Sequence, residues 1–314
     1  MLIKSRGLSV IGSSLSLPAS SLLNEEIWPS TAEWVEETLG IRSRRHISSE
    51  EKLIDLCIES AQNAILAAKL KPTEIDCIIV ATSTPDFINP SMAAIIHGAV
   101  GASNECPAFD IQAVCAGFIY GMGILASLAE NSGSGNYLLI GADQFSKITD
   151  FNKRDSVFFG DAAAAMVIKK SKNESLFAAE IYADGKNWTD FHTPNFTEKF
   201  EMNSTAVGNM ASEVLPKAVK DLCSKLSIDV SDISHFFTHQ PSKVVLDKVE
   251  VNLGLKEGKI HRNLLNRANT ASASIPSVFY DSAQMSKIKS GDLVCFAAIG
   301  AGWVWGVAIM EWRI

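Results

Sequence analysis

The chain has 314 residues, of which 47% are hydrophobic and 20% are charged, so it is long enough to bury one large core or two fused ones, and disorder is not expected. Its formal net charge of −7 argues against nucleic acid as the main partner, because no excess of Lys and Arg exists to neutralise phosphates.

The first forty-six residues or so predict a strand, a helix and a basic segment. Residues Leu8–Ser14 indicate a first strand that ends near Gly12. Ser30, with Glu33 three residues later, has the spacing of a helix capping box, and the glycine at position 40 is typical of a helix end. The basic cluster Arg42–His46 predicts a solvated loop, or a segment that receives a phosphate.

A helix and two strands follow in the first half. Residues Glu50–Ala68 have the apolar spacing of an amphipathic helix. Cys77–Ala81 is an apolar run that predicts a strand. The run Phe109–Val114 alternates apolar with small or polar residues, as a short strand does, and apolar residues recur at helical spacing from Cys115 onward.

Cys115 is therefore predicted to lie at a strand-to-helix turn. Unpaired backbone N–H groups and the positive end of the helix dipole favour a thiolate at such a position, so Cys115 is a candidate nucleophile. For an isolated cysteine, the alternative of a small buried hydrophobic residue is the more common one.

The second half repeats this order of elements. Ala211–Leu226 predicts a helix, and His235–Thr238 predicts a strand that ends at a turn containing Pro241. Ile233 lies 158 residues after Ile75 (233 minus 75) in the matching position of the first half. A repeat of this kind indicates two similar α/β halves, each with a sheet covered by helices.

The ends of the two halves also resemble each other. Gly160 and Gly300 each begin a turn that runs into an apolar strand. We place the join in the polar stretch Lys169–Ser175, which gives an N-terminal half of residues 1–170, carrying Cys115, and a C-terminal half of residues 171–314.

The six cysteines form no CxxC pair or regular framework, and most lie within apolar runs. This pattern is typical of reduced, buried thiols in a cytoplasmic protein. Residues Met1–Val10 lack the long apolar core of a signal peptide, and no uninterrupted apolar run has the length of a membrane span. We therefore expect a cytoplasmic protein without membrane insertion.

Three polar residues are expected where strand ends meet. Cys115 is the first, His239 follows the strand of the second half, and Asn269 lies in the small-residue run Arg267–Pro276. A single histidine or asparagine is more often a satisfied core or turn residue. Three together, on matching ends of duplicated units, favour a catalytic site.

Several blocks of the sequence resemble those of the ketoacyl-acyl carrier protein synthase III family, which are thiolase-fold condensing enzymes. The blocks are AVCAGF at 113–118, FGDA at 159–162, THQP at 238–241, ANTAS at 268–272, and IGAG at 299–302 with Trp305-Gly306. The resemblance runs in order from about Ser5 to the C-terminus. It implies a thiolase-like α/β fold of two duplicated halves in an α-β-α-β-α arrangement.

The resemblance also implies a chemistry. Cys115, His239 and Asn269 would form a Cys-His-Asn triad, with an acyl group held on Cys115 as a thioester. The backbone N–H groups of Cys115 and Ala301 would form the oxyanion hole, although Ala301 stands where a glycine is usual. His239 and Asn269 would stabilise the enolate left by decarboxylation of a malonyl thioester, and neither a metal ion nor an organic cofactor is expected.

Substrate and partner contacts follow from the same resemblance. Trp34 and Arg154 match a pair that stacks on the adenine of coenzyme A. Asn89 stands where a large apolar residue commonly closes the acyl pocket of the partner subunit, so a homodimer is expected. Acyl-CoA and acyl carrier protein are the expected partners.

Three further positions depart from the family pattern. Thr38 replaces a frequent arginine, and Asn209 and Val244 occupy positions that are usually basic and favour carrier-protein docking. The leading hypothesis is an acyltransferase that starts fatty acid synthesis by joining an acyl group from acyl-CoA to malonyl-acyl carrier protein. The alternatives are a specialised enzyme of a secondary-metabolite or other pathway that passes the acyl group to another acceptor, and a non-catalytic partner subunit, which would be expected to lack Cys115.

Overall fold

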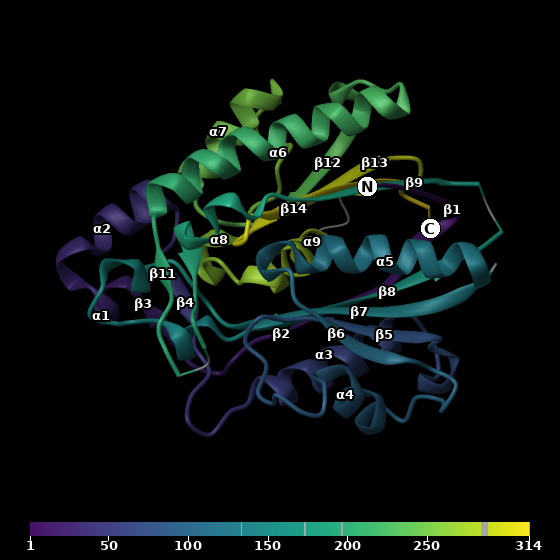
Figure 1. Ribbon diagram of the computed structural model, residues 1–314, viewed down its shortest axis with the longest axis horizontal. Coiled ribbons are helices and arrows are strands. Elements are labelled where there is room, and N and C mark those ends of the chain that lie inside the picture. The colour runs from purple at the N-terminus through teal and green to yellow at the C-terminus, as the bar shows by residue number, and fades with distance from the viewer. Residues whose placement is uncertain (133, 173, 196, 284–287, 314) are drawn as a thin grey trace.

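Two five-stranded sheets lie face to face with helices between and outside them, as Figure 1 shows. This computed structural model describes residues 1–132, 134–172, 174–195, 197–283 and 288–313. From top to bottom in Figure 1 the layers alternate as helix, sheet, helix, sheet and helix. The layered thiolase-like α/β arrangement expected from the sequence is therefore confirmed.

The first sheet belongs to the N-terminal half. Its order is β2 (Leu8–Ser16), β8 (Ala162–Lys170), β7 (Gly135–Asp143), β5 (Cys77–Ala81) and β6 (Ala108–Ile111). β8 is antiparallel to both β2 and β7, whereas β5 is parallel to both β7 and β6. The carboxyl ends of β5, β6 and β7 therefore meet at one edge of the sheet, where ligand sites of α/β proteins form.

The second sheet repeats this plan. Its order is β1 (Leu2–Arg6), β9 (Leu176–Ala183), β14 (Val304–Glu311), β13 (Leu293–Gly300) and β12 (Ile233–Thr238). The strands β9, β14, β13 and β12 have the order and directions of β2, β8, β7 and β5. The counterpart of β6 is reduced to one parallel bridge between Phe236 and Ile260.

Helices cover the outer face of each sheet and fill the layer between the two sheets. The outer faces carry α3 (Leu53–Ala67) and α4 (Met92–Val100) on the first sheet, and α6 (Ser204–Leu226) and α7 (Lys243–Leu253) on the second, while α5 (Gly117–Ser132) and α9 (Ser274–Ala283) lie between the sheets. Shorter elements are α1 (Asn24–Ile27), α2 (Ala32–Trp34), α8 (Leu264–Arg267), the pair β3 (Ser21–Leu23) and β4 (Ser43–Arg45), and the pair β10 (Phe191–His192) and β11 (Glu201–Met202).

The central helix α5 is rich in apolar residues, which suits its position between the two sheets. Within the described residues, one helical stretch, Val114–Ser132, is long and apolar enough to cross a membrane by length and composition. It packs instead between the sheets, where Phe118, Ile119 and Leu125 are fully buried in the core. The same composition suits a helix buried on both sides.

Most of the predicted elements form, with shifted bounds. The predicted first strand, Leu8–Ser14, continues through Gly12 to Ser16, and only its register shifts between Val10 and Gly12. The helix expected from Ala211 begins seven residues earlier, at Ser204. The strand predicted at Cys77–Ala81 has those bounds.

Two local predictions are wrong. Ser30 makes no capping box, because residues 29–31 form a separate 3₁₀ turn before α2; the end at Gly40 is correct. The basic segment 42–46 is not a solvated loop. Arg44 is fully buried, and its Nη2 donates to Asn24 Oδ1 at 2.7 Å and to the carbonyl of Val157 at 2.9 Å. Its side chain thus joins two interior segments rather than receiving a phosphate from solvent.

The division into residues 1–170 and 171–314 stays a prediction, and one strand crosses it. β1 comes from the first range but pairs with β9 at the edge of the second sheet. Of the join proposed at Lys169–Ser175, residue 173 lies outside the described residues.

Candidate active site

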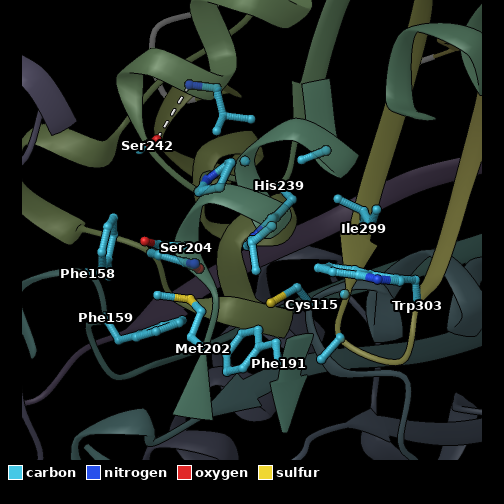
Figure 2. Close-up of a pocket in the computed structure, with 18 residues that line it drawn as sticks. Cys115, Phe158, Phe159, Phe191, Met202, Ser204, His239, Ser242, Ile299 and Trp303 are labelled. Atoms are coloured by element: carbon cyan, nitrogen blue, oxygen red, sulfur yellow. Dashed lines mark hydrogen bonds between the residues drawn. The ribbon is translucent and has the colours of Figure 1, made fainter. Parts of the chain in front are cut away.

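A narrow cavity of about 70 Å³ collects residues from both halves of the chain. Cys115 comes from the first half, whereas His239, Asn269 and Ala301 come from the second, and all four line it. Figure 2 shows Cys115 and His239 side by side within this cavity. Its mouth lies at the exposed Ser204 at the start of α6. The three polar residues singled out from the sequence therefore meet in one place.

Cys115 lies in a 3₁₀ turn, Val114–Ala116, between β6 and α5. Val114 has a φ of +45°, a conformation that is strained for a β-branched residue. The turn is fixed from the other half by Gly300, where an added Cβ would lie 2.9 Å from the amide nitrogen of Cys115. Glycine at position 300 thus lets the end of β13 approach the backbone of the cysteine.

The predicted stabilisation of a thiolate at Cys115 is wrong for this site. Burial raises the pKa of the Cys115 thiol, the nearby Asp143 raises it further, and the cysteine's own backbone N–H lowers it. Desolvation of the charged form therefore outweighs the helix start. Since the thiol is the resting form, a base must take its proton when it reacts.

His239 directly follows β12, and its amide donates to the carbonyl of Ala297 at 2.8 Å. Its Nδ1 lies 3.2 Å from the hydroxyl of the buried Ser274, which leaves Nε2 for a substrate or for Cys115. Burial lowers the pKa of His239 to about 3, so the ring is neutral near pH 7. Because a serine hydroxyl both donates and accepts, Ser274 can support either tautomer of the ring.

Asn269 is held by both backbone and side chain. Its amide donates to the carbonyl of Phe158, and its carbonyl accepts from the amide of Gly160, each at 3.0 Å. Its side-chain Oδ1 accepts from the amide of Ala271 at 2.9 Å. With the oxygen engaged in this way, the NH₂ group is the part of the side chain that remains to donate to a substrate.

A buried carboxylate supports the loop that carries Asn269. Asp143, at the end of β7, accepts from the amide of Ser272 at 3.1 Å and from its hydroxyl at 2.6 Å. Its other oxygen accepts from the amide of Ser83 at 2.8 Å and from the hydroxyl of Thr84 at 2.9 Å. Burial raises the pKa of Asp143. This network was not predicted, because a contact between residues 143 and 272 leaves no local pattern in the sequence.

Ala301 follows the end of β13 in the turn that leads to β14, and it lines the cavity. Among the described residues, five other than glycine have positive φ, namely Lys69, Val114, Ser227, Ala268 and Ala271. Ala301 is not one of them, so its methyl group imposes no left-handed strain where a glycine was expected. Its role as an oxyanion-hole donor stays a prediction.

Trp34 and Arg154, which the resemblance pairs on the adenine of coenzyme A, lie against each other. The guanidinium carbon of Arg154 is 4.0 Å from the centre of the Trp34 ring. Trp34, Phe158 and Val207 pack against the same hydrophobic cluster, and Phe158 and Val207 also line the cavity. The contact of Trp34 and Arg154 with adenine stays a prediction.

Asn89 is exposed and does not line the cavity of its own chain. Asn209 is exposed on α6, and Val244 is 38% exposed near the start of α7. Close to Val244, Lys243 pairs with Asp247 at 2.6 Å. Within the described part of the chain, no group of three or more His, Cys, Asp or Glu side chains could hold a metal ion.

Comparisons with known proteins agree with this geometry. The family model for 3-oxoacyl-[acyl-carrier-protein (ACP)] synthase III matches residues 109–185, and its C-terminal counterpart matches residues 223–312. The beta-ketoacyl-[acyl-carrier-protein] synthase III of Rickettsia prowazekii is 34% identical, covering 96% of this chain and 99% of the relative.

Solved structures give the same result. The crystal structure of 3-oxoacyl-[acyl-carrier-protein] synthase III from Aquifex aeolicus VF5 has a TM-score of 0.93 and 29% identity, covering 98% of this chain and all of that chain. The priming beta-ketosynthase of the R1128 polyketide pathway has a TM-score of 0.90 and 25% identity, covering 99% and 98% of the two chains.

Proposed function

Because the chain belongs to the 3-oxoacyl-[acyl-carrier-protein] synthase III family, we propose that it joins an acyl group from acyl-CoA to malonyl-acyl carrier protein, with release of carbon dioxide, as the first condensation of fatty acid synthesis. One observation carries the assignment of roles: Cys115, His239 and Asn269 line a single narrow cavity, although they come from both halves of the chain.

In the first step Cys115 takes the acyl group. Nε2 of the neutral His239 accepts the thiol proton, and the sulfur attacks the acyl carbon of the thioester. The negative charge on the carbonyl oxygen is stabilised by the backbone N–H groups of Cys115 and Ala301. The carbon–sulfur bond to coenzyme A then breaks, and the coenzyme leaves as a thiol with the proton that His239 returns.

In the second step the malonyl thioester loses carbon dioxide. The electron pair of the broken carbon–carbon bond moves onto the thioester oxygen, where Nδ2 of Asn269 donates a hydrogen bond. His239 donates a second one in its other neutral tautomer, with the proton on Nε2, which Ser274 stabilises by donating its hydroxyl to Nδ1. The enolate carbon attacks the acyl carbon on Cys115, and the carbon–sulfur bond to Cys115 breaks. The thiolate that leaves takes up one proton from solvent, which restores the thiol. The charge is held by side-chain donors throughout, so this route requires neither a metal ion nor an organic cofactor.

Substrate binding follows from the surroundings of the cavity. The stacked pair Trp34 and Arg154 offers two flat faces for the adenine of coenzyme A. The carrier protein would dock near the mouth, over α6 and α7. We propose that the enzyme acts in the cytoplasm as a homodimer, with the exposed Asn89 of each subunit directed at its partner.

A specialised acyltransferase is the second candidate. The priming beta-ketosynthase from a polyketide pathway shares the fold over nearly the whole chain. The residues Thr38, Asn209 and Val244 weaken the expected contacts with coenzyme A and the carrier protein. These positions affect which acyl donor and acceptor bind and leave the chemistry at Cys115 unchanged.

Intact-protein mass spectrometry after incubation with acyl-CoA tests the first step. The wild-type chain should gain one acyl group, and Cys115→Ala should gain none. The variants Cys106→Ala and Cys295→Ala are matched controls, because both thiols are buried and neither lines the cavity; both should load normally. An acyl adduct that persists on Cys115→Ala would exclude the proposed nucleophile.

A further inference from the structure

Arg44 is a buried cation that the catalytic steps do not use. Its side chain is fully buried on β4, and burial lowers its pKa to about 10, so it stays charged near pH 7. Among the described residues, its Nε and Nη1 have no hydrogen-bond partner. Such a cation is weak evidence for stability, because the two uncharged acceptors of Nη2 offset only part of the cost of removing it from water. Its role is therefore expected in the segments that these acceptors belong to.

One acceptor belongs to the segment that carries Arg154. Val157 ends the 3₁₀ turn η6 (Arg154–Val157), in which Arg154 is exposed whereas Ser156 and Val157 are buried. The carbonyl of Val157 accepts from Nη2 of Arg44 at 2.9 Å. This bond fixes the buried end of the turn, three residues after Arg154 (157 minus 154).

The other acceptor belongs to a side chain that holds the segment of Trp34. Asn24 is buried at the start of α1, and its Oδ1 accepts from Nη2 of Arg44 at 2.7 Å. Its Nδ2 donates to the carbonyl of Ala32 at 3.2 Å and to that of Ile41 at 2.7 Å. Ala32 begins α2, which ends at Trp34. The amide of Asn24 thus joins Arg44 to both ends of the segment that carries Trp34.

A second bond joins the same two parts of the chain. Trp28 directly follows α1, and its Nε1 donates to the hydroxyl of Ser156 in η6 at 2.9 Å. Figure 1 shows α1, α2, β3 and β4 together at the left end of the molecule. The distance of 4.0 Å between the guanidinium carbon of Arg154 and the centre of the Trp34 ring therefore depends on bonds made by neighbouring residues of each segment.

We propose that Arg44 is a positioning residue for the acyl donor: together with Asn24, it holds the segments of Trp34 and Arg154 at the spacing that receives the adenine of coenzyme A. The inference rests on the proposed function, since it takes this pair as the adenine contact. It gives the basic segment 42–46 a role in donor binding, in which a cation acts from the interior and does not itself touch the donor.

Two acyl donors distinguish this role from a general loss of structure. Acetyl-CoA carries the adenine, whereas acetyl-pantetheine has the same thioester arm and lacks the nucleotide. Acylation of Cys115 is followed by intact mass at a series of donor concentrations, which gives the half-saturating concentration and the maximal rate for each donor. A disturbance that reaches the cavity affects both donors alike, because the same thiol attacks the same acetyl group. The ratio of the two half-saturating concentrations therefore reports the adenine contact.

Arg44→Met should raise the half-saturating concentration of acetyl-CoA about tenfold, as expected for the loss of one stacking contact, and leave that of acetyl-pantetheine near the wild-type value. Arg44→Lys keeps the charge on a shorter side chain without the planar fork, so it should shift the ratio in the same direction. Circular dichroism checks that each variant is folded.

Arg45 provides the matched control. It is the next residue of β4, and its Nη1 donates to the carbonyls of Pro18 and Ala19 at 2.7 and 2.8 Å, which belong to neither segment. Arg45→Met therefore loses two bonds of the same kind and should keep the wild-type ratio.

Four results would overturn the proposal. These are equal half-saturating concentrations of the two donors for the wild-type chain, an unchanged ratio in folded Arg44→Met, an equal shift in Arg45→Met, and, should Arg44→Met fail to fold, an unchanged ratio in Arg44→Lys. If neither donor acylates the wild-type chain, the proposed function itself fails, and the two failures are thereby distinguished.

Discussion

At the scale of single residues, the hydrogen bond that Ala271 donates to Asn269 decides what this asparagine can do. With Oδ1 engaged at 2.9 Å, the side chain presents its NH₂ group to the substrate, which suits the thioester oxygen that becomes negative during decarboxylation. Backbone strain at Ala268 and Ala271, with φ of +56° and +49°, flanks this residue. Strain of this kind is retained where surrounding structure fixes it, often at functional sites.

Substitution of Asn269 should separate the two steps of the reaction. Asn269→Ala should load an acyl group on Cys115 at nearly the wild-type rate and lower carbon dioxide release from a malonyl thioester by about 10²–10³-fold, the effect of removing one oxyanion donor. The measurement pairs intact mass with a carbon dioxide assay on one sample. A variant that loads normally and decarboxylates at the wild-type rate would make Asn269 a structural turn residue.

The neutral state of His239 predicts the pH dependence of the second step. Burial lowers the pKa of His239 to about 3, below the ordinary value of about 6.5, so the ring loses its proton well below neutral pH. Carbon dioxide release from a preloaded acyl-enzyme should therefore be flat between about pH 5.5 and 8. A fall in the single-turnover rate with a midpoint near pH 6.5 would contradict the burial of this ring in the working enzyme.

The sequence predicts a site residue where a pattern of neighbouring residues marks it, and not where the residue is defined by a contact with a distant segment. Cys115 and His239 follow strand ends and Asn269 lies in a run of small residues, all three in recognisable motifs, so their meeting was predictable. Ser274 beside His239 and Asp143 beside Ser272 were not, since these contacts join segments 35 and 129 residues apart. The charge state of Cys115 was predicted wrongly, because a turn position does not reveal the degree of burial.

At the scale of elements, periodicity predicted the long helices and central strands, and it failed where tertiary contacts decide. The basic segment at 42–46 forms β4 because it pairs with β3, and the buried Arg44 finds acceptors from Asn24 and Val157. The edge strand β1 has only five residues, and it pairs with β9 from Arg6 with Leu176 to Leu2 with Glu180, which are 170 and 178 positions apart (176 minus 6 and 180 minus 2). Neither pairing leaves a pattern in the local sequence.

Strand β7 lies very close to the loop that carries Asn269, and a substitution in β7 tests whether this contact positions the loop. An added Cβ at Gly141 would lie 2.3 Å from the carbonyl oxygen of Ser272, which is backbone and cannot rotate away. Gly141→Ala should therefore displace the loop of Asn269, lower the free energy of unfolding by about 1–3 kcal/mol, and slow condensation. Chemical denaturation and the carbon dioxide assay measure these effects.

Gly98 in α4 provides the matched control. An added Cβ there meets nothing within 4 Å, so Gly98→Ala should leave condensation unchanged and stabilise the helix by about 0.5–1 kcal/mol. Equal effects of the two substitutions on stability and condensation would show that the contact with Ser272 does not position the catalytic loop.

At the scale of the whole molecule, the active site exists because two similar halves face each other. The cysteine comes from one half and the histidine and asparagine from the other. Cys115 and His239 each lie near the end of a strand of their own sheet, and Asn269 lies in the loop after α8. The internal repeat made this arrangement predictable. Two departures from the repeat were not predictable. The second sheet has a single bridge where the first has β6, and β1 pairs in the second sheet although it belongs to the first half of the chain.

Assembly of two copies is the next prediction at this scale. Phe87 and Ile88 are 39% and 78% exposed beside Asn89, and exposed apolar neighbours of this kind favour contact with another protein surface. Light scattering at the assay concentration should give the mass of a dimer. A monomer with full activity at that concentration would contradict a role for Asn89 in the partner's acyl pocket.

The central claim is that the acyl group on Cys115 becomes joined to the carbon that loses carbon dioxide. The most direct measurement loads the enzyme with isotope-labelled acetyl-CoA, removes the free thioester, and adds malonyl-acyl carrier protein. We predict that the label leaves the enzyme and is found on the carrier protein as a labelled 3-oxobutanoyl group, with one carbon dioxide released for each label transferred. Transfer of the label to an oxygen or nitrogen acceptor, or its discharge to water without carbon dioxide, would contradict a condensing enzyme and favour an acyltransferase of another kind.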